Sequence, residues 1–231
     1  MSEGPFGVRD RPGGDPPAAP PPPPPVPARR RTASWIAGLA VVLALAYITL
    51  NTIRTEAPGS RGVEAGSRLP PFAAPLALSR LTGDANLATR PDSGGQGERP
   101  ACSVRGPDIL NSCQLAERGP VVLAFVAVRS DACNRQIDAL ERMRPRYPDV
   151  GFAAVAIRGD RDELRTVIHR RGWQLPVAYD SDGGVANAYA VAICPTMTFA
   201  YRGGRVDGTT FSLLEGAPLR ERIERIQRAR P

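Results

Sequence analysis

Blocks of apolar residues separated by helical patterns fill the second half of the chain. The run Val121–Val128 (VVLAFVAV) is continuously apolar, which is typical of a strand buried on both faces. A second run of this kind covers Gly151–Ile157 (GFAAVAI). Between them, residues 131–144 place apolar side chains at helical spacing, and Ser130 is a suitable N-cap for that helix. The pattern predicts a strand, a helix and a second buried strand.

The pattern continues to the end of the chain in the same alternating manner. It predicts a helix over 161–171, a strand over 176–179, a short helix over 184–189, a hairpin of 196–201 with 206–211, and a closing helix over 218–228. This order is typical of an α/β domain in which helices cover both faces of a mixed sheet.

One segment is apolar enough to cross a membrane. Residues Trp35–Ile53 contain no charged side chain, and nineteen residues at about 1.5 Å each extend roughly 28 Å, close to the thickness of a hydrocarbon core. Three arginines at 29–31 precede the segment, and Arg54 follows it. We therefore predict a transmembrane helix over residues 34–53, with the N-terminus cytoplasmic and the rest extracytoplasmic. A cleaved secretory signal is the alternative, and it also exports the C-terminal part.

The composition divides the rest of the chain. Of 231 residues, 25 are Pro and 23 are Gly, and they concentrate before the apolar segment and after it. We expect a disordered Pro-rich cytoplasmic tail over residues 1–33, a linker over 54–70, and one extracytoplasmic domain over 71–231.

The net charge of +7 does not indicate nucleic-acid binding. All 30 basic residues are arginine, they are scattered, and aromatic residues make up only 6% of the chain, whereas a nucleic-acid surface needs basic residues clustered on one face among aromatics. The sequence says nothing about the oligomeric state.

Three strings resemble the thioredoxin-like superfamily, and most closely its membrane-anchored TlpA/ResA-type thiol-disulfide oxidoreductases, which overlap with the redoxin (AhpC/TSA-like) group. They are FVAVRSDACNRQIDAL (125–140), RRGWQLPVAYDSDGGVANAYAV (170–191) and PTMTFAYRGGR (195–205). The resemblance implies a thioredoxin-like fold and extracytoplasmic protein thiols or disulfides as substrates. It also implies that Pro195 follows a cis peptide bond and faces the redox motif.

The chain departs from this family at the redox motif itself. Ser130 stands where the family has the first cysteine of Cys-x-x-Cys, and Cys133 keeps the second position. A serine hydroxyl neither ionises near neutral pH nor forms a disulfide, so the usual cycle within the motif is excluded. Cys194 directly precedes Pro195, and the family's fold would bring it beside Cys133. A redox-cycling pair, a static bridge or two inert thiols, and single-thiol chemistry at Cys133 all remain open.

The other two cysteines, Cys102 and Cys113, flank a Gly-Pro turn. In an exported domain this spacing suggests a local structural disulfide, so we favour the pairings 102–113 and 133–194. The cysteine spacing and the single histidine do not fit a metal site, and no cofactor motif is present. His169 lies on the polar side of its predicted helix, and Asp180 and Asp182 indicate a turn.

Three functions fit these residues. The first is a thiol-disulfide oxidoreductase acting through Cys133 with Cys194. The second is a peroxiredoxin-like peroxidase, although Val126 stands where that pattern has proline. The third is a non-catalytic binding domain that kept the fold.

Overall fold

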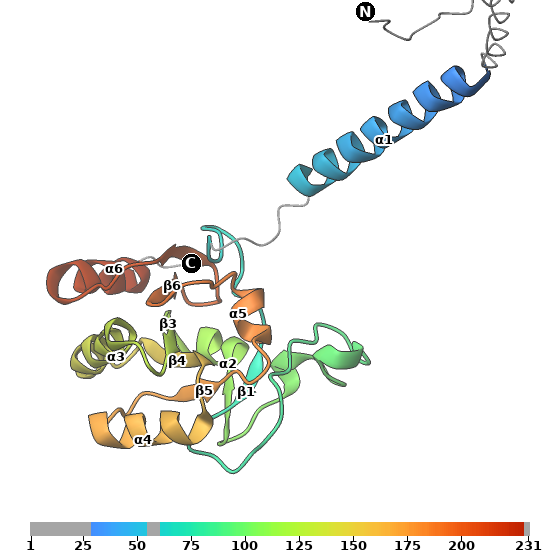
Figure 1. The fold of residues 1–231 in the computed structure, drawn as a ribbon. Coiled ribbons are helices and arrows are strands. Elements are labelled where there is room, and N and C mark those ends of the chain that lie inside the picture. Colours follow the sequence, from blue (N-terminus) through green and yellow to red (C-terminus); the bar gives the residue numbers. More distant parts are fainter. Residues whose placement is uncertain (1–28, 55–60, 229–231) are drawn as a thin grey trace, which may run out of the picture. The chain divides into compact units, whose positions relative to one another are not determined.

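The structure is a computed structural model that describes residues 29–54 and 61–228, shown in Figure 1. The chain forms two compact units, residues 1–55 and 56–231. The predicted tail up to residue 28, and residues 55–60 of the predicted linker, lie outside the described residues.

The described residues of the first unit form one helix, α1 (Arg29–Arg54), which includes the predicted span of residues 34–53. Its described side chains, from 35 to 47, are exposed. Among the residues that the structure describes, no helix combines the length and the apolar character needed to cross a membrane. The membrane location therefore stays a prediction from the sequence pattern.

The second unit is built on a five-stranded sheet with the order β5-β4-β3-β6-β7. Its central strand, β3 (Val121–Ala127), runs parallel to β4 (Gly151–Arg158) and antiparallel to β6 (Thr196–Ala200). The outer strands are β5 (Val177–Tyr179) and β7 (Val206–Thr210). The sheet is mixed, as predicted, and the apolar run at 121–128 forms its centre.

Helices cover both faces of this sheet. One core cluster joins the sheet to α3 (Asp131–Met143), α4 (Arg161–Arg171) and α6 (Gly216–Arg228). The other joins it to α2 (Ser112–Arg118) and α5 (Gly184–Ala188).

The side chains of β3 alternate between these two cores. Val122, Ala124 and Val126 face the first core. The second core receives Val121, Leu123 and Phe125. All six are at most 1% exposed, which explains why this strand reads as an unbroken apolar run.

Short elements in the Pro- and Gly-rich region were not predicted. β1 (Ala73–Pro75) pairs antiparallel with β2 (Ile109–Asn111), and α2 follows β2 directly. Two 3-10 helices of this region cover Gly94–Gln96 and Ala101–Ser103, and a third, Arg144–Arg146, directly follows α3.

The described part of the predicted linker packs against the domain. The backbone N–H of Gly66 donates to Val206 at 2.8 Å, and that of Leu69 donates to Gly204 at 2.8 Å. Domain contacts therefore begin before residue 71.

Candidate functional site

The first half of the candidate site lies at the N-terminus of α3. Ser130 is the N-cap residue with an extended backbone, and its carbonyl oxygen accepts from Asn134 N–H at 3.0 Å. Its hydroxyl makes no capping bond. Cys133 lies in the first turn and is 0% exposed. The sulfur therefore lies close to backbone N–H groups that have no partner within the helix, where a negative charge is favoured.

The second half comes from the loop that enters β6. The peptide bond between Cys194 and Pro195 is cis. Strand register brings this loop to the end of β3, because Phe125 of β3 pairs with Thr196 of β6. The Cys194 sulfur lies 3.2 Å from the carbonyl oxygen of Phe125. Cys194 is partly exposed, whereas Pro195 is buried.

These two halves meet in a disulfide. Cys133 and Cys194 are 61 residues apart in sequence, and their Cα atoms are 5.7 Å apart, a normal separation for bonded cysteines. The pairing is the one favoured from the sequence, and the cis bond at Pro195 is also as expected. The two residues differ in exposure, because Cys133 is buried and Cys194 partly reaches the surface.

The loop between β3 and α3 is supported by the segment that leads into α4. Gly159 has φ +106°, and a Cβ atom there would lie 2.8 Å from Cγ2 of Val128. Arg129 donates from Nε to the Glu163 carboxylate at 3.1 Å. Because the Arg129 side chain is 82% exposed, this pair contributes at most about 1 kcal/mol. The close packing at Gly159 therefore constrains this loop more than the ion pair does.

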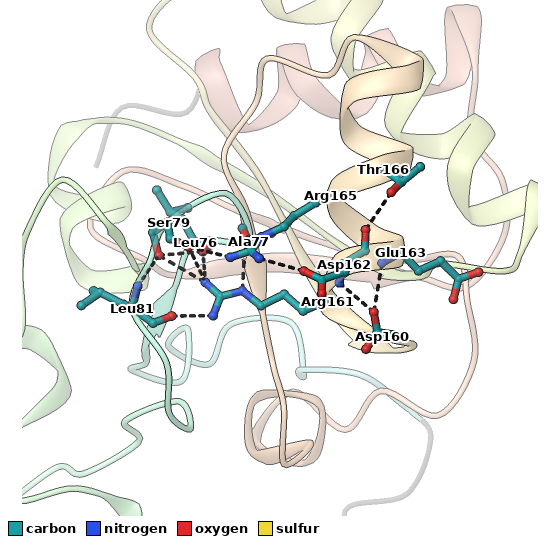
Figure 2. A network of polar contacts seen from close by, with 10 residues as sticks. All are labelled: Leu76, Ala77, Ser79, Leu81, Asp160, Arg161, Asp162, Glu163, Arg165 and Thr166. Atoms are coloured by element: carbon teal, nitrogen blue, oxygen red, sulfur yellow. Dashed lines mark hydrogen bonds and ion pairs between the residues drawn. The ribbon is translucent and has the colours of Figure 1, made fainter.

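Figure 2 shows how the N-terminus of α4 is itself held in place. Asp160 caps the helix by accepting from the backbone N–H groups of Asp162 at 2.8 Å and Glu163 at 3.1 Å. Arg161 reaches away from the helix into a loop about 80 residues earlier in the chain. At distances from 2.5 to 3.2 Å its guanidinium donates to the carbonyl oxygens of Leu76, Ala77, Ser79 and Leu81.

Arg165, one turn later in the helix, binds the same loop. It donates to the carbonyl oxygens of Ala77 at 2.7 Å and Ser79 at 2.8 Å. Burial, and then the charge of Arg165, lower the pKa of Arg161 from its usual value. We define the arginine clamp as Arg161 and Arg165. It fixes the position of α4 and touches neither sulfur of the disulfide.

Sequence reasoning missed Asn134, which follows Cys133 in α3. Its side-chain amide donates to the carbonyl oxygen of Val128 at 3.2 Å. Its Oδ1 atom is buried without a hydrogen-bond partner. A polar residue in the first turn of a predicted helix was the only available signal, and it does not show which way the side chain points. The Asn134 side chain therefore links α3 by a hydrogen bond to the loop before Ser130.

The other polar residues considered from the sequence face solvent or organise a turn. His169 is exposed. Asp131 is also exposed, and its carboxylate lies 4.0 Å from Arg171. Asp180 is 3% exposed and accepts from the backbone N–H groups of Val185 and Ala186, at the start of α5. Burial raises the pKa of this carboxyl, while those two hydrogen bonds lower it. Asp180 therefore organises a turn, as predicted.

The structure also joins Cys102 to Cys113, with Cα atoms 5.4 Å apart. Cys102 is exposed and Cys113 is partly buried at the start of α2. No group of three or more potential metal ligands occurs within the described residues.

Comparison with solved structures identifies the fold. A candidate thiol:disulfide interchange protein DsbE from Chlorobium tepidum superposes with a TM-score of 0.55 at 16% identity, over 71% of this chain and 98% of that one. A candidate protein disulfide isomerase from Bacteroides thetaiotaomicron gives a TM-score of 0.55 at 15% identity, over 74% and 95%. The domain has a thioredoxin-like fold.

A further thioredoxin-like neighbour is the thioredoxin domain of a thiol-disulfide oxidoreductase from Bacteroides vulgatus. It has a TM-score of 0.51 at 12% identity, over 71% of this chain and 97% of that one. The AhpC/TSA family model matches residues 108–207, from β2 to the start of β7. No curated protein matches the chain by sequence.

Proposed function

We propose that the domain is a thiol-disulfide oxidoreductase whose reacting pair is Cys133 and Cys194. The observation that carries the proposal is their disulfide, which joins a buried sulfur at a helix N-terminus to a partly exposed residue before Pro195. Redox proteins of this kind need one sulfur that a substrate can reach and one that leaves easily as a thiolate. Ser130 takes no part in the electron transfer, because its hydroxyl forms no disulfide.

The first step is attack by a substrate thiolate on the sulfur of Cys194. Cys133 is 0% exposed, so an external nucleophile reaches Cys194. The Cys133–Cys194 bond breaks, a bond between the substrate and Cys194 forms, and the electron pair moves to Cys133. The N-terminus of the thirteen-residue helix α3 stabilises the resulting thiolate. A stabilised thiolate is also a better leaving group.

The second step releases the substrate as a disulfide. A second thiolate of the substrate attacks its own sulfur in the mixed disulfide, and the electron pair moves to Cys194. In the disulfide the Cys194 sulfur lies 3.2 Å from the carbonyl oxygen of Phe125, so the protonated thiol has an acceptor within reach of a weak hydrogen bond. The substrate dithiol has lost two electrons and two protons, and the cysteine pair has gained them. Run in reverse, the same steps reduce a substrate disulfide.

Trapping experiments test this order of events. In a chain already carrying Cys102→Ser and Cys113→Ser, Cys133→Ser leaves one accessible thiol. We expect that variant to form a stable mixed disulfide with a synthetic peptide closed by one disulfide. The matched Cys194→Ser variant keeps only the buried thiol, and we expect at least about tenfold less adduct because access limits exchange.

Two results would contradict the proposal at different levels. More adduct on Cys194→Ser than on Cys133→Ser would reverse the roles of the two sulfurs. If the folded chain that keeps only Cys133 and Cys194 exchanges with neither a dithiol peptide nor a disulfide peptide, the pair is static.

We also propose that α1 anchors the chain in a membrane with the domain on the extracytoplasmic side. The support is the charge-free segment 35–53 preceded by three arginines. In intact cells, we expect an external protease to remove the domain from the chain. Cleavage only after lysis would place the domain inside the cell.

A further inference from the structure

We propose that the Cys102–Cys113 disulfide is a second thiol-disulfide exchange site, which accepts electrons from external dithiols independently of Cys133 and Cys194. The proposal goes beyond the function proposed above.

Access is the first observation. The Cys102 residue is exposed and Cys113 is partly exposed. Both line an open hollow of about 370 Å³. The other lining residues include Arg68, Leu69, Ala116 and Gly204. A thiolate must approach a sulfur closely to exchange with it, and this hollow leaves room for that approach.

The loop that carries the two cysteines is also held without the disulfide. The side-chain amide of Asn111 donates to the carbonyl oxygens of Ala101 and Val104, each at 2.8 Å. The Arg105 side chain donates from Nε to the carbonyl oxygen of Cys102 at 2.9 Å. These contacts would keep the loop folded after the sulfur–sulfur bond opens. The two thiols would then stay close together, so the bond could form again.

Charge around the hollow favours a thiolate. The Glu117 carboxylate lines the hollow as well, and Arg105 balances its charge through a two-bond ion pair at 2.6 and 2.8 Å. Arg68 also lines the hollow, and it makes no ion pair among the described residues. A neighbouring cation stabilises a thiolate relative to a thiol. Among the residues that line the hollow, the charge left without an ion pair is therefore positive.

The two disulfides lie at opposite ends of β6. Cys194 comes two residues before this strand, whereas Gly203 and Gly204, which line the hollow, follow it. Five residues at about 3.4 Å each separate them by roughly 17 Å, too far for direct exchange within one chain. The second pair must therefore react with external thiols.

The reaction is balanced by the external dithiol. Its first thiolate attacks the sulfur of Cys102, the more exposed of the two residues, the bond to Cys113 breaks, and Cys113 leaves as a thiolate. The second thiol of the reagent, as a thiolate, then displaces Cys102. The dithiol becomes a disulfide, and Cys102 and Cys113 each end as a thiol after taking up the two protons. The shared substrate chemistry is a dithiol, from a small molecule or a protein.

The test uses the full-length chain with Cys133→Ser and Cys194→Ser, which keeps only the second pair. The oxidised chain is mixed with dithiothreitol or with reduced ribonuclease A, and free thiols are alkylated after set times. Trypsin cleaves after Arg105, so Cys102 and Cys113 fall in different peptides and each is counted by mass spectrometry. The matched Cys102→Ser, Cys113→Ser chain reports the first pair under the same conditions.

We expect both cysteines to become alkylated in the folded chain, with unchanged near-ultraviolet circular dichroism. We expect opening at least tenfold faster than that of Cys133–Cys194, and closure again on adding glutathione disulfide. Reaction with dithiothreitol alone would assign a small thiol as substrate, and reaction with both reagents would assign protein dithiols as well. A bond that opens only when urea unfolds the chain would overturn the proposal. That outcome leaves the function proposed for the first pair untouched, because the matched chain reports it separately.

Discussion

Replacing Gly159 by alanine should disturb both stability and disulfide exchange. This glycine has φ +106°, a backbone conformation that L side chains rarely adopt, and its added Cβ would lie 2.8 Å from Cγ2 of Val128. Val128 is 4% exposed and lies just before the loop that leads to Ser130. Gly159→Ala therefore combines backbone strain with a clash against Val128, which leads into the loop between β3 and α3.

Gly172, the C-cap residue of α4, offers a matched control. It has φ +67°, and a Cβ there would meet nothing within 4 Å. Gly172→Ala should cost only the left-handed backbone strain, about 1–2 kcal/mol. Gly159→Ala adds overpacking against a buried valine, which typically costs about 1–3 kcal/mol more. We therefore expect a total of about 2–5 kcal/mol for Gly159→Ala.

Urea unfolding of the two variants measures these costs, and the rate at which a dithiol peptide opens Cys133–Cys194 measures the functional effect. We expect Gly159→Ala to change that rate and Gly172→Ala to leave it close to the wild-type value. The reasoning fails if Gly172→Ala destabilises the domain as much as Gly159→Ala does. It also fails if both variants exchange at the wild-type rate.

Two further predictions concern the arginine clamp and the buried carboxylate. Arg161→Met should destabilise the domain by about 2–3 kcal/mol in urea unfolding, because it removes charge-assisted bonds to four carbonyl groups. Arg165→Met removes two such bonds and should cost less. A larger loss of stability in Arg165→Met than in Arg161→Met would contradict the geometry. Burial raises the pKa of the Asp180 carboxyl in the folded chain. The contribution of this carboxyl to the free energy of unfolding should therefore fall as the pH rises from about 4 towards the raised pKa, and stay constant above it. Asp180→Asn should lack this part of the pH dependence when unfolding is measured between pH 4 and 7, and identical slopes for both chains would refute the assignment.

The main strands and helices of the fold were predictable because their burial leaves a recognisable pattern of apolar residues in the sequence. The central strand and α3 carry unbroken or helical apolar patterns, and the structure confirms both nearly to the residue. The strand pair β1 and β2 was missed because each strand has only three residues and precedes the alternating pattern of strands and helices, whereas the equally short β5 falls within that pattern. Helix α2 was missed as well, since its seven residues also precede that pattern, whereas the five-residue helix α5 falls within it.

Only the part of the candidate site that matches a sequence motif was predictable. The resemblance to thioredoxin-like proteins placed Cys194 beside Cys133, and the structure joins them. The unequal access to the two sulfurs was not predictable, because it depends on how α3 packs against the sheet. The contacts of Arg161 in the arginine clamp were not predictable either, since its partners lie 80 to 85 residues away in the sequence.

The two disulfides follow one another along the chain without interleaving. Cys102 and Cys113 are 11 residues apart, and both precede Cys133 and Cys194. During synthesis from the N-terminus, Cys102 therefore meets its native partner before any competing cysteine has been made. Cys133 and Cys194 are made only after that pair is complete, so the order of translation favours the native pairing.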